Sequence, residues 1–243
     1  MIEIDGLVKT YGSIHAVSGL CFSVRAGEIL GLVGPNGAGK TTTLRCTTGI
    51  IPPTSGRISI AGFDLAQQPL DAKRRLAFVP DEPRLFDYLT AWDHLTITSR
   101  LYGVSDGPER AQRLLEEFEL ADRRTAFPSE LSRGMKQKLM VAMALLHRPQ
   151  AMLLDEPLTG LDPAAMRRMK TRIRETAKDG VALILSSHML HLVEELCHRV
   201  VVVVRGKKAL DGTLEEIRRD SPGLAGDADL EAIFMKAIEG EGA

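Results

Sequence analysis

Two adjacent acidic residues follow a run of apolar residues in the segment AMLLDEPLTGLD, at positions 151–162. The apolar run predicts a buried strand, and Asp155 and Glu156 stand where this strand ends. Neighbouring carboxylates repel each other, and at the edge of a core they cost free energy unless a cation or a proton-transfer reaction uses them. We therefore expect a positively charged partner near these two acids.

A glycine-rich segment, GPNGAGKT at positions 34–41, supplies that partner. It fits the spacing G-x-x-x-x-G-K-[ST] and lies between a predicted strand and a predicted helix, whereas a plain glycine-rich turn would not need this context. Such a loop wraps its backbone N–H groups around a phosphate chain at a helix N-terminus. Lys40 is expected to reach the β- and γ-phosphates, and the Thr41 hydroxyl to bind Mg²⁺. The predicted nucleotide-binding residues of the loop are Gly34, Pro35, Asn36, Gly37, Ala38, Gly39, Lys40, Thr41 and Thr42.

The two acids then have separate expected roles. Asp155, at the carboxyl end of its strand, is expected to hold the Mg²⁺ that Thr41 also binds. Glu156 is expected to polarise the water that attacks the γ-phosphate. The alternative is a pair of helix-start acids before Pro157, which accounts for the acidity but not for the apolar run and the phosphate loop together.

The composition is that of an ordinary globular protein. The chain has 243 residues, 44% of them hydrophobic, which is enough for one large domain. Its 31 Lys and Arg against 32 Asp and Glu give a net charge of -1, so no global field favours nucleic acid or anionic lipid. The apolar runs are shorter than the roughly 20 residues of a membrane-spanning helix, and the N-terminus lacks a signal peptide's apolar core. Three widely spaced cysteines indicate the cytosol.

Apolar periodicity predicts the elements that must position these residues. The predicted strands are 2–8, 20–24, 28–34, 56–62, 74–80, 151–156 and 181–187, followed by a hairpin of 200–204 with 207–212 at Gly206. The predicted helices are 40–50, closed by Gly49, then 162–180, opened by Asp162 and Pro163, and one through 192–196. The tail carries one weak amphipathic stretch at 230–238. The pattern is that of an α/β core.

The middle of the chain changes to a helical pattern throughout, from Thr90 to Arg148. Thr90 and Asp93 resemble a capping box at its start. Further on, Leu114 and Phe118 share one helix face, and Leu139 and Leu146 share another. The pattern predicts a helical insertion of roughly 60 residues, approximately 85–148.

The segment LSRGMKQK, at positions 131–138, resembles the signature segment of the ATP-binding cassette (ABC) ATPases, and the similarity to that family covers nearly the whole chain. The resemblance implies that this segment opens a helix whose N-terminus binds the γ-phosphate of ATP held by the opposite subunit. Two cassettes would then close head to tail around two nucleotides. The residues it assigns to this role are Ser132, Arg133, Gly134 and Met135, with Ser132 and the Gly134 N–H as principal donors. Taken alone, Ser132 is a helix N-cap, and this capping role is compatible with phosphate binding.

The same resemblance assigns three further residues. Tyr11 resembles the aromatic residue on which adenine stacks, although a packing role is the alternative. Asp162 lies at the end of LTGLD, which is similar to the loop that crosses the dimer interface, so it is expected to be both a cap and an interface contact. His188, at the end of a strand in SSH, resembles the family's switch histidine, and we expect it beside the γ-phosphate as a catalytic residue with Glu156.

Three positions depart from the family pattern. Asp81 in FVPDEP replaces the usual Gln that contacts Mg²⁺ and the lytic water, and its carboxylate is still expected to reach the metal. Arg133 replaces the first signature glycine, and Met135 replaces the usual Gln. These changes affect side-chain contacts to the opposite nucleotide but leave the backbone N–H of Gly134 in place.

The resemblance and the pattern together predict one ABC ATPase domain, 1–243, of the α/β class. It would have a P-loop NTPase (RecA-like) core with N-terminal antiparallel strands and an inserted α-helical subdomain. The predicted parts are a core of 1–84 and 149–212, a helical subdomain of about 85–148 and a short C-terminal tail, 213–243.

The family further implies a subunit that binds and hydrolyses ATP with Mg²⁺ to power a membrane transporter, of an export-type bacterial subfamily. Its expected partners are integral membrane permease subunits and a second cassette, as a homodimer or a heterodimer on ATP binding, and no nucleic acid. The expected location is cytoplasmic, peripheral on the inner membrane. A non-transport ABC ATPase acting on nucleic acid or protein assembly is the alternative, and a small P-loop kinase or GTPase is the third hypothesis.

One apolar cluster lies where the helical insertion begins. Its members, in PRLFDYLTAW, are Leu85, Phe86, Tyr88, Leu89 and Trp92. A cluster of this kind in a connecting segment favours a groove for a partner helix. The alternative is the core of the helical subdomain, which is equally expected for Trp92 and less so for Phe86.

Overall fold

The structure is a computed structural model that describes residues 1–219, 232, 234 and 235. Most of the amphipathic stretch predicted at 230–238 lies outside the described residues. Within the described part, no helix has both the length and the hydropathy needed to cross a membrane.

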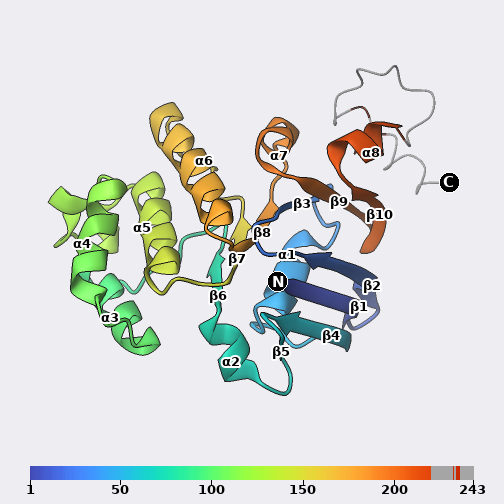
Figure 1. Ribbon diagram of the computed structural model, residues 1–243, viewed down its shortest axis with the longest axis horizontal. Helices are drawn as coiled ribbons and strands as arrows, with labels where there is room; N and C mark the ends of the chain where they lie inside the picture. The colour runs from blue at the N-terminus through green and yellow to red at the C-terminus, as the bar shows by residue number, and fades with distance from the viewer. Residues whose placement is uncertain (220–231, 233, 236–243) are drawn as a thin grey trace.

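Two β-sheets form the body of the molecule (Figure 1). The first is antiparallel, with the strand order β2-β1-β4-β5. Its strands are β1 Ile2–Tyr11, β2 Ile14–Val24, β4 Ser55–Ile60 and β5 Phe63–Asp64. Exposed and buried residues alternate at the start of β1, as expected for a strand with one face on the core.

The second sheet has the order β10-β9-β3-β8-β7-β6, and its neighbouring strands are parallel except for the β9–β10 hairpin. Its strands are β3 Ile29–Val33, β6 Leu76–Val79, β7 Ala151–Asp155, β8 Ala182–Ser186, β9 Arg199–Val204 and β10 Lys207–Gly212. Every residue of β3, β7 and β8 is buried, because helices or the first sheet cover both faces.

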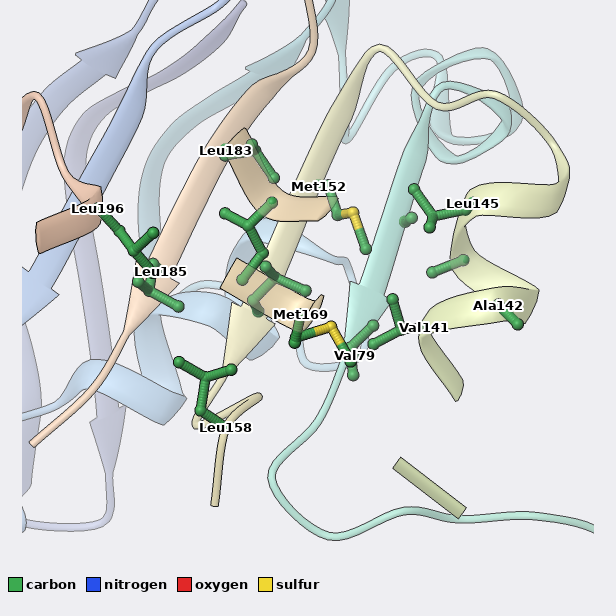
Figure 2. Close-up of a cluster of buried hydrophobic side chains, with 14 of the residues drawn as sticks. Val79, Val141, Ala142, Leu145, Met152, Leu158, Met169, Leu183, Leu185 and Leu196 are labelled. Carbon is green, nitrogen blue, oxygen red and sulfur yellow. The ribbon is translucent and has the colours of Figure 1, made fainter. Parts of the chain in front are cut away.

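Five helices pack around the second sheet. They are α1 Lys40–Thr47, α2 Pro69–Arg74, α6 Pro163–Lys178, α7 Leu190–Leu196 and α8 Leu214–Arg219. Leu44 and Cys46 of α1 belong to a core cluster that joins the first sheet to one face of the second. The other face packs on α5, α6 and α7 through residues such as Met152 and Met169 (Figure 2).

Three helices, α3 Ala91–Tyr102, α4 Gly107–Glu117 and α5 Arg133–Leu146, form a group beside the second sheet. The predicted capping box opens α3: the Asp93 N–H donates to the Thr90 hydroxyl at 3.1 Å, and the Thr90 N–H to the Asp93 carboxylate at 3.0 Å. The prediction that 90–148 is helical throughout is wrong between α4 and α5. There the chain forms only two 3₁₀ turns, η1 Ala121–Arg123 and η2 Pro128–Glu130. Glu119 has a φ of 58°, and Pro128 lacks an N–H, so neither continues a helix.

The observed elements confirm the predicted α/β class, with antiparallel strands at the N-terminus and an inserted helical group. The sequence analysis missed α2, α8 and β5, which have six, six and two residues. Elements this short carry too little periodicity to be recognised.

Candidate active site

The phosphate loop, residues 34–39, connects β3 directly to α1. Its close contacts need glycine at two positions. A Cβ on Gly34 would lie 2.2 Å from the Val203 carbonyl oxygen, and one on Gly39, whose φ is 105°, would lie 2.4 Å from the Ala16 carbonyl oxygen. The sequence therefore holds this backbone in a tight turn against neighbouring strands, immediately before the N-terminus of a helix.

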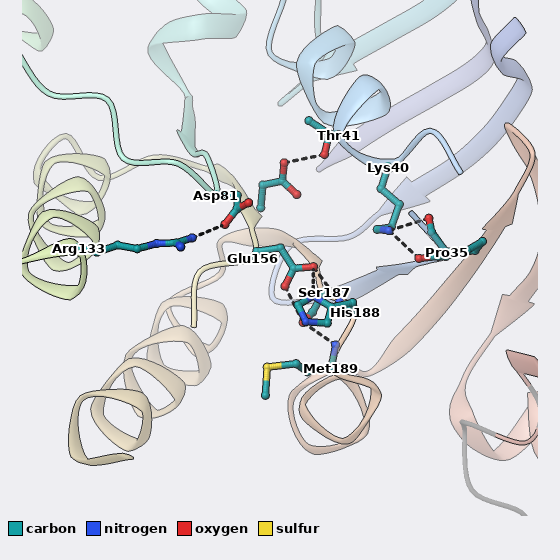
Figure 3. A network of polar contacts seen from close by, with 11 residues as sticks. Pro35, Lys40, Thr41, Asp81, Arg133, Glu156, Ser187, His188 and Met189 are labelled. Atoms are coloured by element: carbon teal, nitrogen blue, oxygen red, sulfur yellow. Dashed lines mark hydrogen bonds and ion pairs between the residues drawn. The ribbon is translucent and has the colours of Figure 1, made fainter. Parts of the chain in front are cut away.

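Lys40, the first residue of α1, turns its ammonium group back into this loop (Figure 3). Its Nζ donates to the carbonyl oxygens of Gly34 at 2.6 Å and Pro35 at 3.1 Å. Burial lowers the pKa of Lys40, and the nearby charges of Glu156 and Asp155 oppose this change. A cation with these neighbours is suited to bind phosphate oxygens, because phosphate would replace carbonyl dipoles with full negative charge.

Asp155 ends β7 and is only 3% exposed. The Thr41 hydroxyl, from the first turn of α1, donates to its carboxylate at 3.0 Å. Burial raises the pKa of Asp155; the hydrogen bond from Thr41 opposes the rise, and the charges of Glu156 and Asp81 add to it. A bound divalent cation would offset this desolvation, so the geometry fits the predicted Mg²⁺ ligands.

Glu156 follows β7 with a φ of 50°, a conformation that non-glycine residues adopt rarely. One oxygen of its carboxylate, Oε1, accepts from the backbone N–H of His188 at 2.8 Å and lies 2.8 Å from His188 Nδ1. The other, Oε2, accepts from the Ser187 hydroxyl at 3.2 Å (Figure 3). Adjacent parallel strands explain the meeting, because Asp155 pairs with Ser186 and the segments after β7 and β8 leave the same sheet edge.

Ser187 was not predicted as a site residue. Its hydroxyl completes the set of donors that holds the Glu156 carboxylate. The sequence signal was the SSH segment itself, in which a hydroxyl precedes the histidine, but a serine at a strand end is too common to be singled out.

Asp81 lies just after β6, and its carboxylate meets the guanidinium of Arg133 rather than a site hydroxyl. Arg133 Nη2 donates to Asp81 Oδ1 at 3.1 Å (Figure 3). This partner was not foreseen, because nothing in the sequence relates a residue after a strand to one in the signature segment 52 positions later. The role of Asp81 at the metal stays a prediction.

The signature residues stand at the start of α5. Ser132 is the N-cap: its hydroxyl accepts from the Met135 N–H at 3.2 Å. Ser132 and Arg133 are exposed, and Gly134 and Met135 are partly buried. The predicted cap is confirmed, and the first turn of this 14-residue helix has N–H groups without intrahelical partners, which suit an anion.

The two remaining predicted residues lie at element ends. Tyr11 ends β1 with 47% of its surface exposed, and Lys9 Nζ lies 5.0 Å from its ring centroid. The ring therefore offers a face to solvent. Asp162 caps α6 by accepting from the N–H groups of Ala165 at 2.8 Å and Ala164 at 2.9 Å, and these bonds lower its pKa.

Within the described residues, no group of three or more His, Cys, Asp or Glu could hold a metal ion by itself. Asp155 with the Thr41 hydroxyl is a sparse set of oxygen ligands. Mg²⁺ is bound in this way where substrate phosphates and water complete its octahedral shell. The residues present thus fit Mg²⁺ together with a nucleotide.

The fold and this site define a P-loop nucleotide-hydrolysing protein, with a phosphate loop, an aspartate beside its threonine, and a glutamate held by a histidine. Comparison with known proteins narrows the class. The model of the ABC transporter family matches residues 17–159, and the chain belongs to this family.

Three similar proteins illustrate the match. The ABC-type transporter ATP-binding protein EcsA of Bacillus subtilis is 33% identical, over 97% of this chain and 96% of that protein. The Nod factor export ATP-binding protein I of Paraburkholderia xenovorans is 40% identical, over 87% of this chain and 70% of that protein. A solved structure of an ATP-binding subunit of an ABC transporter is 36% identical, covers 98% of this chain and 99% of that one, and superimposes with a TM-score of 0.92.

These findings confirm three predictions: the family, the P-loop α/β fold and the function of an ATP-binding subunit that hydrolyses ATP for a transporter. The individual site residues stay predictions, which the geometry above supports.

Proposed function

We propose that this chain is the energising subunit of an exporter, placed on the cytoplasmic face of the inner membrane. It would associate with integral membrane permease subunits and close with a second cassette on ATP. The observation that carries the proposal is the pairing of two contacts at one sheet edge: Thr41 with Asp155, and Glu156 with His188. The direction of transport rests on a similar protein named for Nod factor export.

The chain's own residues divide the chemistry between them. Lys40 and the N–H groups of the loop would bind the phosphates, and Thr41 and Asp155 would hold Mg²⁺, which supplies charge neutralisation when bound. Glu156 would accept a proton from the attacking water. His188 and Ser187 keep its carboxylate oriented, through contacts of 2.8 Å and 3.2 Å, so that little reorganisation is needed during the reaction.

Part of the proposed site comes from a second chain. Ser132 and the N–H of Gly134 would bind the γ-phosphate of ATP held by the other subunit, because they begin a helix with unpaired N–H groups. Asp162, exposed beside this region, would contact the partner loop while it caps α6. A homodimer and a heterodimer with another cassette use the same surfaces.

Tyr11 provides a test of adenine binding. We expect Tyr11→Ala to raise the Kd for MgATP about fivefold, since an aromatic stacking contact contributes on the order of 1 kcal/mol. Tyr11→Phe should keep the parental Kd, because the hydroxyl has no part in stacking. The measurement is isothermal titration calorimetry with MgATP. Equal affinities for all three proteins would show that adenine binds elsewhere.

Phe86 tests the contact with the membrane partner. It is 70% exposed, near Tyr88, which is 92% exposed, at the start of the helical group. We expect Phe86→Ala to leave basal ATPase within about twofold, since the residue lies outside the site, and to remove about 1.5–3 kcal/mol of apolar contact with a partner helix. Co-purification with the permease and transport should fall together. Leu70→Ala is the matched control, because Leu70 is 73% exposed on α2; equal transport by both variants would contradict this docking site.

A further inference from the structure

Two of the three departures from the family pattern contact each other. Arg133 Nη2 lies 3.1 Å from Asp81 Oδ1, and the two side chains are 56% and 51% exposed. Exposed ion pairs contribute little to folding stability because solvent screens them. This pair is therefore better explained by the geometry it imposes than by the stability it adds.

The stem of Arg133 also contacts a third segment. A Cβ built on Gly160 would lie 3.3 Å from Arg133 Cδ, so the arginine passes directly over this glycine. A Cβ on Gly134 would in turn lie 3.1 Å from the Gly160 carbonyl oxygen. The start of α5 thus touches the loop between Glu156 and Asp162 with both its arginine and its glycine.

Three segments of one chain meet at Arg133 as a result. They are the segment after β6, through Asp81; the loop after β7, through Gly160; and the N-terminus of α5 itself. The first two leave the core sheet at the edge where Asp155 and Glu156 stand, and the third belongs to the helical group α3–α5. Arg133 joins these segments at the site edge, while farther from the site Arg172 of α6 pairs with Glu117 of α4 and Arg168 of α6 pairs with Glu119.

We propose that Arg133 is a positioning residue that fixes the N-terminus of α5 relative to the core of its own chain, held by Asp81 on one side and seated on Gly160 on the other. The inference rests on the proposed function in one respect: the groups so positioned, Ser132 and the Gly134 N–H, are those assigned to the other subunit's ATP. A planar guanidinium on a long stem suits this role, since it packs and makes a directed hydrogen bond at once. A glycine at this position could do neither.

This inference gives Asp81 a role different from that of a metal ligand, and charge reversal separates the two. If Asp81 acts through Arg133, then Asp81→Arg combined with Arg133→Asp rebuilds the pair in reverse. If Asp81 acts on Mg²⁺, an arginine at its position repels the metal, and no change at Arg133 restores function.

The dimer provides the first readout, in a Glu156→Gln background with MgATP, by sedimentation velocity. We expect each single reversal to weaken dimerisation about tenfold, and the double reversal to recover part of this loss, because the ion pair is rebuilt. Recovery should stay incomplete, because Arg133→Asp removes the stem that packs on Gly160. The affinity of the Arg133→Asp monomer for a fluorescent ATP analogue should stay within about twofold, because Arg133 lies outside the phosphate loop of its own chain. Arg133→Lys should retain only part of the dimer affinity of the background protein, because an ammonium group lacks the planar, forked hydrogen-bonding geometry of a guanidinium.

The nucleotide-free chain provides a second readout that does not depend on the proposed function. Spin labels at Glu116→Cys on α4 and Lys207→Cys on β10, with the exposed Cys21 replaced by Ser, report the distance between the helical group and the core. We expect Arg133→Asp to broaden the distance distribution measured by electron–electron double resonance, and the double reversal to narrow it part of the way back to the parental one.

The exposed pair of Glu82 and Arg84, 3.7 Å apart, is the matched control, and its reversal should leave both readouts unchanged. A double reversal no better than the worse single variant, in the distance distribution, would overturn the positioning role. Failure of the background protein to dimerise with ATP would instead count against the proposed function. The distance measurement would still test whether Arg133 positions α5.

Discussion

Glu156→Gln is expected to lower steady-state ATP hydrolysis by about 10² to 10⁴, the usual contribution of general-base catalysis, while MgATP still binds. Gln keeps the shape of Glu and can still accept from the His188 N–H, but it cannot take a proton from water. The measurement is phosphate release at saturating MgATP, alongside binding of a fluorescent ATP analogue.

The control for this variant is Glu82→Gln, since Glu82 is an exposed acid whose side chain pairs with Arg84. It should hydrolyse ATP at the parental rate. A Glu156→Gln protein that also kept the parental rate would remove Glu156 from the catalytic assignment.

Asp155→Asn is expected to weaken MgATP binding at least about tenfold, a change of roughly 1.4 kcal/mol, because a neutral amide is a poor ligand for Mg²⁺. Binding of ATP with the metal chelated should change far less, since Lys40 and the loop N–H groups are intact. Titration calorimetry with and without EDTA separates the effect on metal binding from the effect on nucleotide binding. Equal loss of affinity in both conditions would mean that Asp155 acts on the fold of the site and not on the metal.

The same variant should not destabilise the nucleotide-free protein. Burial raises the folded-state pKa of Asp155 above its unfolded value of about 3.9, so this group destabilises the fold as pH rises from that value through the folded pKa. Above the folded-state pKa the full cost is present, and Asn removes it while still accepting from the Thr41 hydroxyl. The melting temperature without Mg²⁺ should equal or exceed that of the parent protein at pH 7, and the difference should shrink as pH falls toward 4.

The sequence allowed prediction of those parts of the site that follow from local patterns. The positions of Lys40, Thr41 and Asp155 could be predicted from a buried strand, a glycine-rich loop and a helix start. Each of these residues stands at the boundary of an element that the neighbouring sequence specifies. The resemblance placed His188 beside the γ-phosphate, but its contact with the Glu156 carboxylate was not predicted. That contact arises because parallel strands place their carboxyl ends at one edge.

Other features depend on contacts that no local pattern encodes. The Arg133–Asp81 pair joins two exposed residues on different elements, and its geometry is decided by how α5 sits on the core. The interruption between α4 and α5 was missed because buried residues such as Leu120, Ala126 and Leu131 continue the apolar content of the helices around it. Apolar content alone does not reveal that the backbone has left the helical path.

The most direct test of the account is the oligomeric state of Glu156→Gln, measured by size-exclusion chromatography with light scattering. Unhydrolysed ATP should hold two chains together, so we expect a dimer with MgATP and a monomer with MgADP. Adding Ser132→Arg should abolish the ATP-dependent dimer by blocking the N-terminus of α5, while each monomer still binds ATP. The measurement uses the purified chain alone. A Glu156→Gln protein that binds MgATP tightly yet stays monomeric at high concentration would contradict head-to-tail closure of this chain with itself.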